Sequence, residues 1–190
     1  MTRTTTSEFF ERIYQQAPDP WNFAGSDYEQ GRYRSILNAL SPRQYGRAFE
    51  PGCSIGILTA FLAQICDQVE AIDISPTAVR RAREHCEKLT NVQIACGALP
   101  DSIPAENFDL IVFSEIGYYF SRSSLLQLGQ RLISHIPQSG TFLAVHWLGH
   151  SSDHLLSGDE VHQVLESIPG MRHVQADRDT GFRLDRWERL

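Results

Sequence analysis

Residues 47–56, RAFEPGCSIG, decide the fold of this chain. Arg47–Glu50 is a short β-like run, and Gly52 and Gly56 frame the turn that follows it. Glycine lets a backbone turn sharply and lets a ligand approach without an intervening side chain. Since apolar residues then recur at helical spacing through Gly56–Cys66, the segment predicts a strand, a ligand-accessible turn and a helix in succession.

The same alternation of strands and helices continues towards the C-terminus. Strands are expected over Gln68–Ile74, Val92–Cys96, Phe108–Phe113 and Thr141–His146. Helices are expected after the Ser75-Pro76 cap, over Ser123–Ser134, and from the capping box Ser157–Glu160 to a point before Pro169. The run FDLIVF is nearly all apolar, which is typical of a strand buried on both faces of a parallel sheet. Five βα-type units predict an α/β fold with an open, mostly parallel sheet.

Both ends of the chain depart from this alternation. Arg172–Arg178 and Phe182–Glu188 are expected to pair as an antiparallel hairpin across a short glycine-containing loop. Two helical stretches, Ser7–Gln16 and Asp27–Leu40, precede the sheet, and the break at Ala17–Ser26 would let them move relative to it. The predicted organisation is therefore an N-terminal helical lid over residues 1–45 and a sheet domain over residues 46–190.

Composition limits the function classes. The 17 basic and 23 acidic residues give a net charge of −6, which excludes a broadly basic surface and disfavours nucleic acid as a partner. The chain has no apolar run long enough to span a membrane, and its first 16 residues lack the pattern of a secretory signal. The four cysteines show no metal-like spacing and are expected to be buried thiols. We expect a cytoplasmic protein that acts at no membrane; its oligomeric state is not encoded in any recognisable pattern.

Asp73 adds a second element to the glycine turn. It ends the second predicted strand, 21 residues after Gly52. A carboxylate there can accept hydrogen bonds from both ribose hydroxyls of a nucleoside, so the two elements predict a nucleoside cofactor site. The alternative is an ordinary strand-to-helix turn with a helix-capping aspartate. A dinucleotide fingerprint, G-x-G-x-x-G, does not fit because Ser54 replaces its second glycine and residue 57 is Ile.

These segments resemble a known enzyme family. E-P-G-C-S-I-G-I-L-T, residues 50–59, and A-I-D-I-S, residues 71–75, look like the first two motifs of class I S-adenosylmethionine-dependent methyltransferases. That resemblance implies a Rossmann-like, seven-stranded sheet whose last strand inserts antiparallel. D-P-W at residues 19–21 and Y-E-x-x-R-Y at residues 28–33 are further similar to the nodulation protein S family, whose members methylate the amine of a deacetylated chitooligosaccharide.

The resemblance implies a set of cofactor-binding residues in the lid, the glycine turn and the strand ends. They are Trp21, Tyr28, Arg32, Glu50, Gly52, Cys53, Ser54, Asp73, Ile74, Ala98, Leu99 and Ser114. Ser54 replaces a small Gly or Ala of the family pattern, and its hydroxyl is able to add a hydrogen bond to the cofactor. Ala98 stands where many members have an aspartate that binds the adenine amino group. Two structural alternatives stay open: Arg32 pairs with Glu29 on one helical face, and Trp21 pins the lid to the domain.

Methyl transfer requires an aligned acceptor, and an ammonium acceptor must first lose a proton. The loop after the fourth strand falls where family members face the transferred methyl group. Glu115 is therefore expected to bind or deprotonate an amine, Tyr118 to line the acceptor pocket, and His146 to act as a base at the end of the fifth strand. The alternatives are a helix-end carboxylate, a core aromatic residue and a structural histidine.

Together these features predict transfer of a methyl group from S-adenosylmethionine to a small-molecule or oligosaccharide acceptor, at an amine. An O-methyltransferase, a non-catalytic cofactor-binding domain and a nicotinamide-dependent oxidoreductase are the alternatives. His146, His150 and His154 have metal-like spacing beside Asp153, but Gly149 favours a loop there and no metal is expected.

Overall fold

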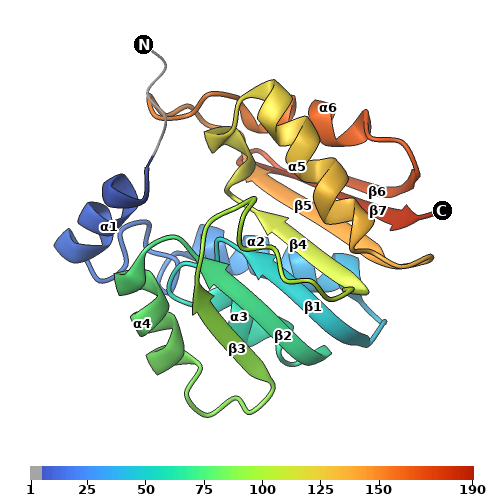
Figure 1. Ribbon diagram of the computed structural model, residues 1–190. Coiled ribbons are helices and arrows are strands. Elements are labelled where there is room, and N and C mark those ends of the chain that lie inside the picture. Colours follow the sequence, from blue (N-terminus) through green and yellow to red (C-terminus); the bar gives the residue numbers. More distant parts are fainter. Residues whose placement is uncertain (1–5) are drawn as a thin grey trace. The chain divides into compact units, whose positions relative to one another are not determined.

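The computed structural model describes residues 6–190 (Figure 1). Residues 1–5, the start of the predicted lid and of the segment that lacks a secretory pattern, lie outside the described residues. The described chain forms two compact units, residues 6–102 and residues 103–190.

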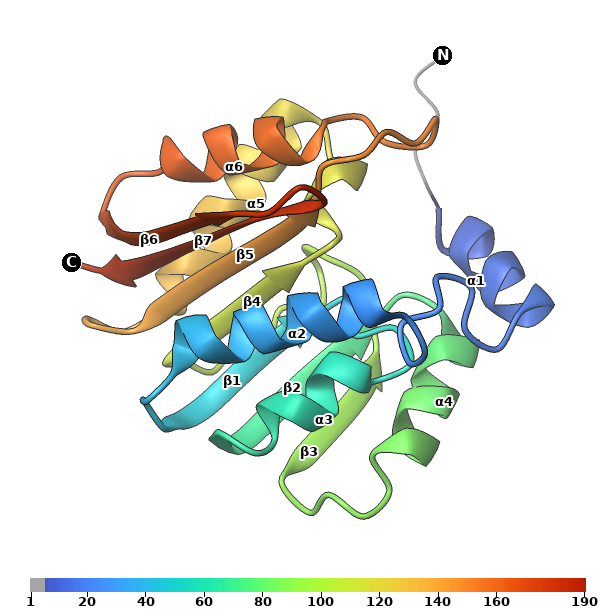
Figure 2. The same ribbon diagram turned by 180° about the vertical axis from the view of Figure 1, so that it is seen from behind.

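The first unit contains two N-terminal helices followed by a β-α-β-α-β run. Its elements are α1 (Ser7–Gln16), α2 (Asp27–Leu40), β1 (Tyr45–Pro51), α3 (Ile57–Leu62), β2 (Cys66–Asp73), α4 (Pro76–His85) and β3 (Val92–Cys96). The strands are parallel, in the order β3-β2-β1. Figure 2 shows α2 and α3 on one face of these strands. Because Pro51 lies opposite Ile72, and Asp73 opposite Cys96, the carboxyl ends of the three strands share one edge.

The second unit carries the rest of the sheet. Its elements are β4 (Leu110–Ser114), the 3-10 helix η1 (Gly117–Tyr119), α5 (Arg122–Ser134), β5 (Thr141–Trp147), α6 (Gly158–Glu166), β6 (Met171–Arg178) and β7 (Phe182–Arg189). The strand order is β4-β5-β7-β6; β4 and β5 are parallel, and β7 is antiparallel to both neighbours. Helices α5 and α6 pack together over one face of these strands (Figure 1).

The predicted fold class is confirmed: the sheet has seven strands, is mostly parallel, and ends in an antiparallel hairpin whose last strand inserts between β5 and β6. The Ser75 cap with Pro76 at the start of α4 is present, as is the Ser157–Glu160 capping box of α6. Strand β4 is buried along its whole length, as its apolar sequence predicts. Within residues 6–190 no helix combines the length and apolarity needed to cross a bilayer.

Three local predictions were wrong. The chain has four βα units rather than five, because residues 97–109, which include Gly97, Pro100 and Pro104, form no helix between β3 and β4. Helix α3 ends at Leu62, before Cys66, because Cys66 pairs with Tyr45 at the start of β2. Cys96 is exposed, since β3 is the first strand in the sheet order, whereas the other three cysteines are buried.

Candidate functional site

The turn after β1 is a strained loop tied to the end of β2. Gly52, Ser54 and Gly56 all have positive φ angles, of 80°, 52° and 83°. The backbone N–H groups of Gly52 and Cys53 both donate to the Ile72 carbonyl, at 2.7 and 3.0 Å. A Cβ on Gly56 would lie 3.1 Å from the Ala82 Cα, so only glycine supplies both this φ and this approach to α4. The loop thus presents its backbone at the carboxyl edge of the strands.

Asp73 links this loop to the start of α4. Its Oδ2 accepts from the Ser54 N–H at 2.8 Å, and its Oδ1 accepts from the Ser75 N–H at 2.9 Å. Burial raises the pKa of Asp73 to about 6, against the lowering effect of these hydrogen bonds. Each carboxylate oxygen accepts more than one hydrogen bond, so Asp73 retains capacity for ribose hydroxyls. The ribose role stays a prediction.

Glu50 is a second buried carboxyl group beside the loop. It is 2% exposed and accepts a hydrogen bond from the Thr59 hydroxyl at 2.6 Å. Burial raises its pKa to about 7, and the Asp73 charge adds to that rise. Cys53 is also buried, and burial raises its thiol pKa well above the ordinary value, so it stays a neutral thiol. Two carboxyl groups with raised pKa values at one loop are typical of a ligand-binding site.

Helix α1 is fastened over the loop by contacts that the sequence did not predict. Tyr14 donates its phenolic proton to the Ser54 Oγ at 2.6 Å. Glu11 accepts hydrogen bonds from the Ser75 and Thr77 hydroxyls, each at 2.6 Å, and these hydrogen bonds lower its pKa to about 2. Arg81 donates to the Tyr14 carbonyl at 2.7 Å. The Ser54 hydroxyl, expected near the cofactor, therefore serves as the acceptor for α1.

The lid residues of the prediction occupy two environments. Trp21 and Tyr28 are each 38% exposed, and Trp21 packs edge-on against Tyr14 with ring centroids 5.4 Å apart. Arg32 is buried, forms an ion pair with Glu29, and places its guanidinium 5.7 Å from the centroid of the following tyrosine ring. The helical-face alternative for Arg32 is thus present, and its pairing with a cofactor carboxylate stays a prediction.

The segment predicted to hold adenine follows β3. Ile74, Ala98 and Leu99 are half-buried. The Ala98 N–H donates to the Ser102 hydroxyl at 3.1 Å, and the Ser102 N–H donates to the Ala98 carbonyl at 2.9 Å. Ser102, which sequence reasoning missed, closes this turn. Ile74 and Leu99 would pack their apolar side chains against a planar base.

In the second unit, the residues after β4 bring two catalytic candidates together. Ser114 ends β4 and is buried. Glu115 has a φ of 60°, and its N–H donates to the Val145 carbonyl at 3.0 Å. The Tyr118 hydroxyl donates to Glu115 Oε2 at 2.5 Å, and the Tyr118 ring stacks on His154 with centroids 3.7 Å apart. A carboxylate oriented by a phenol and bordered by aromatic rings is suited to bind an ammonium group.

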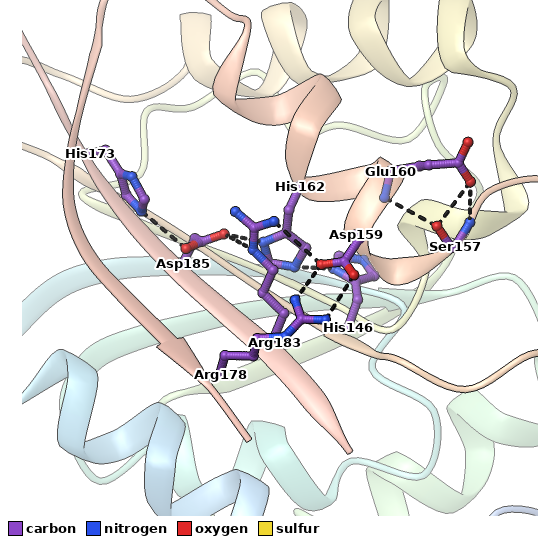
Figure 3. Close-up of polar contacts among 9 residues, drawn as sticks. All are labelled: His146, Ser157, Asp159, Glu160, His162, His173, Arg178, Arg183 and Asp185. Atoms are coloured by element: carbon purple, nitrogen blue, oxygen red, sulfur yellow. Dashed lines mark hydrogen bonds and ion pairs between the residues drawn. The ribbon is translucent and has the colours of Figure 1, made fainter. Parts of the chain in front are cut away.

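His146, the third catalytic candidate, is fully buried near the end of β5. Its Nε2 accepts from the Gly117 N–H at 3.0 Å, and its Nδ1 lies 3.1 Å from His162 Nε2 (Figure 3). Both ring nitrogens therefore face protein groups, in line with the structural-histidine alternative. His150 and His154 lie in a loop, and among residues 6–190 no cluster of three or more His, Cys, Asp or Glu side chains is arranged to hold a metal ion.

Comparison with known proteins identifies the family. The family model described as Nodulation protein S (NodS) matches residues 4–145. The chain belongs to the nodulation protein S family. Nodulation protein S of Bradyrhizobium diazoefficiens is 32% identical over 121 residues, which are 63% of this chain and 57% of that protein. Nodulation protein S of Sinorhizobium fredii is 29% identical over 126 residues, 65% of this chain and 58% of that protein. The chain thus spans less than two thirds of the length of these curated relatives.

Solved structures agree with this membership at the level of the fold. The N-methyltransferase NodS from Bradyrhizobium japonicum WM9, in complex with S-adenosyl-L-homocysteine, superposes with a TM-score of 0.84 at 22% identity. The match covers 96% of this chain and 97% of that one.

Proposed function

We propose that this NodS-family chain transfers a methyl group from S-adenosylmethionine to an amine of a small-molecule or saccharide acceptor. The observation that carries the proposal is the positive-φ loop from Gly52 to Gly56, whose Ser54 N–H is bonded to Asp73. Support comes from the family membership and from the fold shared with an N-methyltransferase bound to S-adenosyl-L-homocysteine.

The first unit is assigned to the cofactor. Asp73 would accept hydrogen bonds from the ribose hydroxyls, and Ile74 and Leu99 would pack against the base. Glu50 and Asp73, both buried, would place negative charge close to a ligand that carries a sulfonium and an ammonium group. We assign residues 1–45 to a helical lid, because Tyr14 and Glu11 fasten α1 to the loop and to α4. Residues 46–190 would then form the methyltransferase domain.

The second unit is assigned to the acceptor. The bound cofactor supplies an activated methyl group, so the protein has to orient the amine and accept its proton. Glu115 is the group we assign to both tasks, since its carboxylate is fixed by the Tyr118 hydroxyl. The cytoplasm is the compartment we propose, because all four cysteines are thiols rather than disulfides.

An acceptor screen with mass-spectrometric detection tests the function. Purified chain is mixed with S-adenosylmethionine and with amines, partially deacetylated chitooligosaccharides or hydroxyl-bearing metabolites. The expected product carries one additional methyl group on nitrogen. Methylation confined to hydroxyl oxygens would replace the amine assignment by an O-methyltransferase, and cofactor binding without any product would favour a non-catalytic domain.

The variant Glu115→Gln separates the acceptor role from folding. We expect kcat on the amine to fall by about a hundredfold, as for loss of a general base. Asp177→Asn, at an exposed carboxylate of β6, is the matched control and should leave kcat unchanged. Full turnover by Glu115→Gln would remove this residue from the proposed site.

A further inference from the structure

Three buried polar side chains form a row beneath the Glu115–Tyr118 turn in the second unit. His146 comes from β5, His162 from α6 and Asp185 from β7, and each is 0% exposed (Figure 3). His146 Nδ1 lies 3.1 Å from His162 Nε2, and His162 Nδ1 lies 2.6 Å from Asp185 Oδ2. Buried polar groups are costly unless they bond to one another, so the geometry of this row restricts its protons.

The row admits one arrangement of protons when both rings are neutral. The Gly117 N–H is a donor, so His146 Nε2 is an acceptor and the ring proton of His146 lies on Nδ1. That proton points at His162 Nε2, which must accept, so the His162 proton lies on its own Nδ1. His162 then donates to the Asp185 carboxylate. Donors and acceptors alternate from Gly117 to Asp185 without a conflict.

The charged end of the row is fixed from outside. Arg183 Nε donates to Asp185 Oδ2 at 2.7 Å, and His173 Nε2 lies 3.1 Å from Asp185 Oδ1. Burial acts to raise the pKa of Asp185, but the hydrogen bonds from His162 and Arg183 outweigh it and keep that pKa below its usual value. Burial lowers the pKa of His162 despite the neighbouring carboxylate. Both shifts favour an Asp185 carboxylate next to a neutral His162 imidazole.

The other end of the row sets the conformation of the turn. A Cβ on Gly117 would lie 2.8 Å from His146 Nε2 and 2.5 Å from Val161 Cγ1, so the backbone there is in close contact with the imidazole. Gly117 opens η1, whose second residue, Tyr118, donates to Glu115. Glu115 has a φ of 60°, a conformation that a non-glycine residue adopts only when its surroundings impose it.

We propose that His146, His162 and Asp185 form a positioning relay that holds the Gly117 N–H and thereby fixes Tyr118 and Glu115 for the acceptor. His146, which the sequence suggested as a base, is therefore assigned the role of a positioning residue. Its effect on turnover rests on the proposed methyl transfer, whereas its proton arrangement does not.

Nitrogen-15 spectra of the histidine rings test the proton arrangement without any assay of activity. In the full chain at pH 8, His146 and His162 should both show a protonated Nδ1 and an unprotonated Nε2. His85, an exposed ring in the last turn of α4, is a control ring outside the relay. A proton on Nε2 of either His146 or His162 would overturn the relay, whatever the outcome of the acceptor screen.

Paired variants test the positioning role. His146→Leu removes the acceptor for Gly117 and should lower kcat by about tenfold or more, with the KM for S-adenosylmethionine unchanged. His146→Gln places an amide oxygen near the Nε2 position and should recover kcat to within about threefold of the wild type, because the Gly117 N–H again has an acceptor. Unchanged kcat in His146→Leu, or equal loss in both variants, would refute the proposal.

A second pair keeps the test decisive if His146→Leu does not fold. His162→Gln retains an acceptor for His146, whereas His162→Leu does not. Amide hydrogen exchange at Gly117 should accelerate at least about tenfold in His162→Leu relative to His162→Gln. Equal exchange rates at Gly117 in both His162 variants would contradict the relay.

Discussion

Two groups of buried polar side chains, one in each unit, differ in how their charge is balanced. At the glycine loop, Asp73 is held by backbone N–H groups and Glu50 by a hydroxyl, all of them neutral, and burial raises both pKa values. In the histidine relay, Asp185 accepts a hydrogen bond from the Arg183 guanidinium, and the pKa of Asp185 is lowered. The relay carboxylate is thus balanced by a cationic side chain, whereas the groups that contact the two loop carboxyl groups are all neutral.

The largest expected effect is a loss of stability when the Asp185 carboxylate of the relay is removed. Asp185→Ala removes the carboxylate that His162 and the Arg183 Nε contact, although Arg183 keeps its pairing with Asp159, and we expect a loss of about 3–5 kcal/mol in the free energy of unfolding. Urea denaturation followed by circular dichroism measures it. A loss below 1 kcal/mol would show that the relay contributes little to the second unit.

Asp73→Asn should weaken cofactor binding and also cost about 1–3 kcal/mol in the free energy of unfolding, because its amide nitrogen would face the N–H of Ser54 or Ser75. An amide donates where a ribose hydroxyl needs an acceptor, so the affinity for S-adenosyl-L-homocysteine should fall by about 1.5–3 kcal/mol, or roughly 10- to 150-fold. Isothermal titration calorimetry measures the change. Glu84→Gln, at an exposed carboxylate of α4, is the matched control. Equal affinities of Asp73→Asn and wild type would make Asp73 a turn-forming residue only.

Gly117→Ala tests how tightly the relay approaches the turn. The added Cβ would lie 2.5 Å from Val161 Cγ1 and 2.8 Å from His146 Nε2, so neighbouring groups must shift. We expect a loss of about 1–3 kcal/mol in the free energy of unfolding, as for other overpacked sites. Gly31→Ala, where no atom lies within 4 Å of the added carbon, is the control for the loss of a glycine. An unchanged free energy of unfolding in Gly117→Ala would show that the turn has room to relax.

The two carboxyl groups of the glycine loop should make the free energy of unfolding depend on pH. The pKa of Asp73 rises from 3.8 to about 6 on folding and that of Glu50 from 4.5 to about 7. Between these values the folded state binds more protons, so these two groups make the free energy of unfolding fall as pH rises from about 4 to 7. Glu50→Gln should flatten this slope by about 1 kcal/mol per pH unit. An unchanged slope would place the Glu50 titration in its ordinary range.

The smallest effect is expected at a surface ion pair that belongs to neither group. Arg80 and Glu84 are separated by 2.9 Å on α4, with both side chains more than half exposed. Arg80→Ala should cost at most about 0.5 kcal/mol, because solvent screens exposed pairs. A larger loss would mean that solvent screens the Arg80–Glu84 pair less than its exposure predicts.

Local patterns were sufficient to predict most elements. The glycine turn, Asp73 at the end of β2 and the Ser157–Glu160 capping box each depend on residues close together in the sequence, so their spacing is informative. The Tyr118–Glu115 contact was not predicted, although only three positions separate its partners in the sequence.

Contacts between distant residues were not predictable in this way. Glu11 meets Ser75 across 64 residues, and His162 meets Asp185 across 23, because helix and strand packing brings them together. No pattern around Asp185 distinguishes it from an exposed strand residue, since alternating charged neighbours surround it in FRLDRWER. The buried relay therefore required the structure.

Calorimetric titration of the full chain with S-adenosyl-L-homocysteine, and separately with a nicotinamide dinucleotide, tests the central claim most directly. The glycine loop with Asp73 predicts one bound S-adenosyl-L-homocysteine per chain and no binding of the dinucleotide. Binding of the dinucleotide alone, or of neither ligand, would contradict the assignment of this loop to an S-adenosylmethionine site.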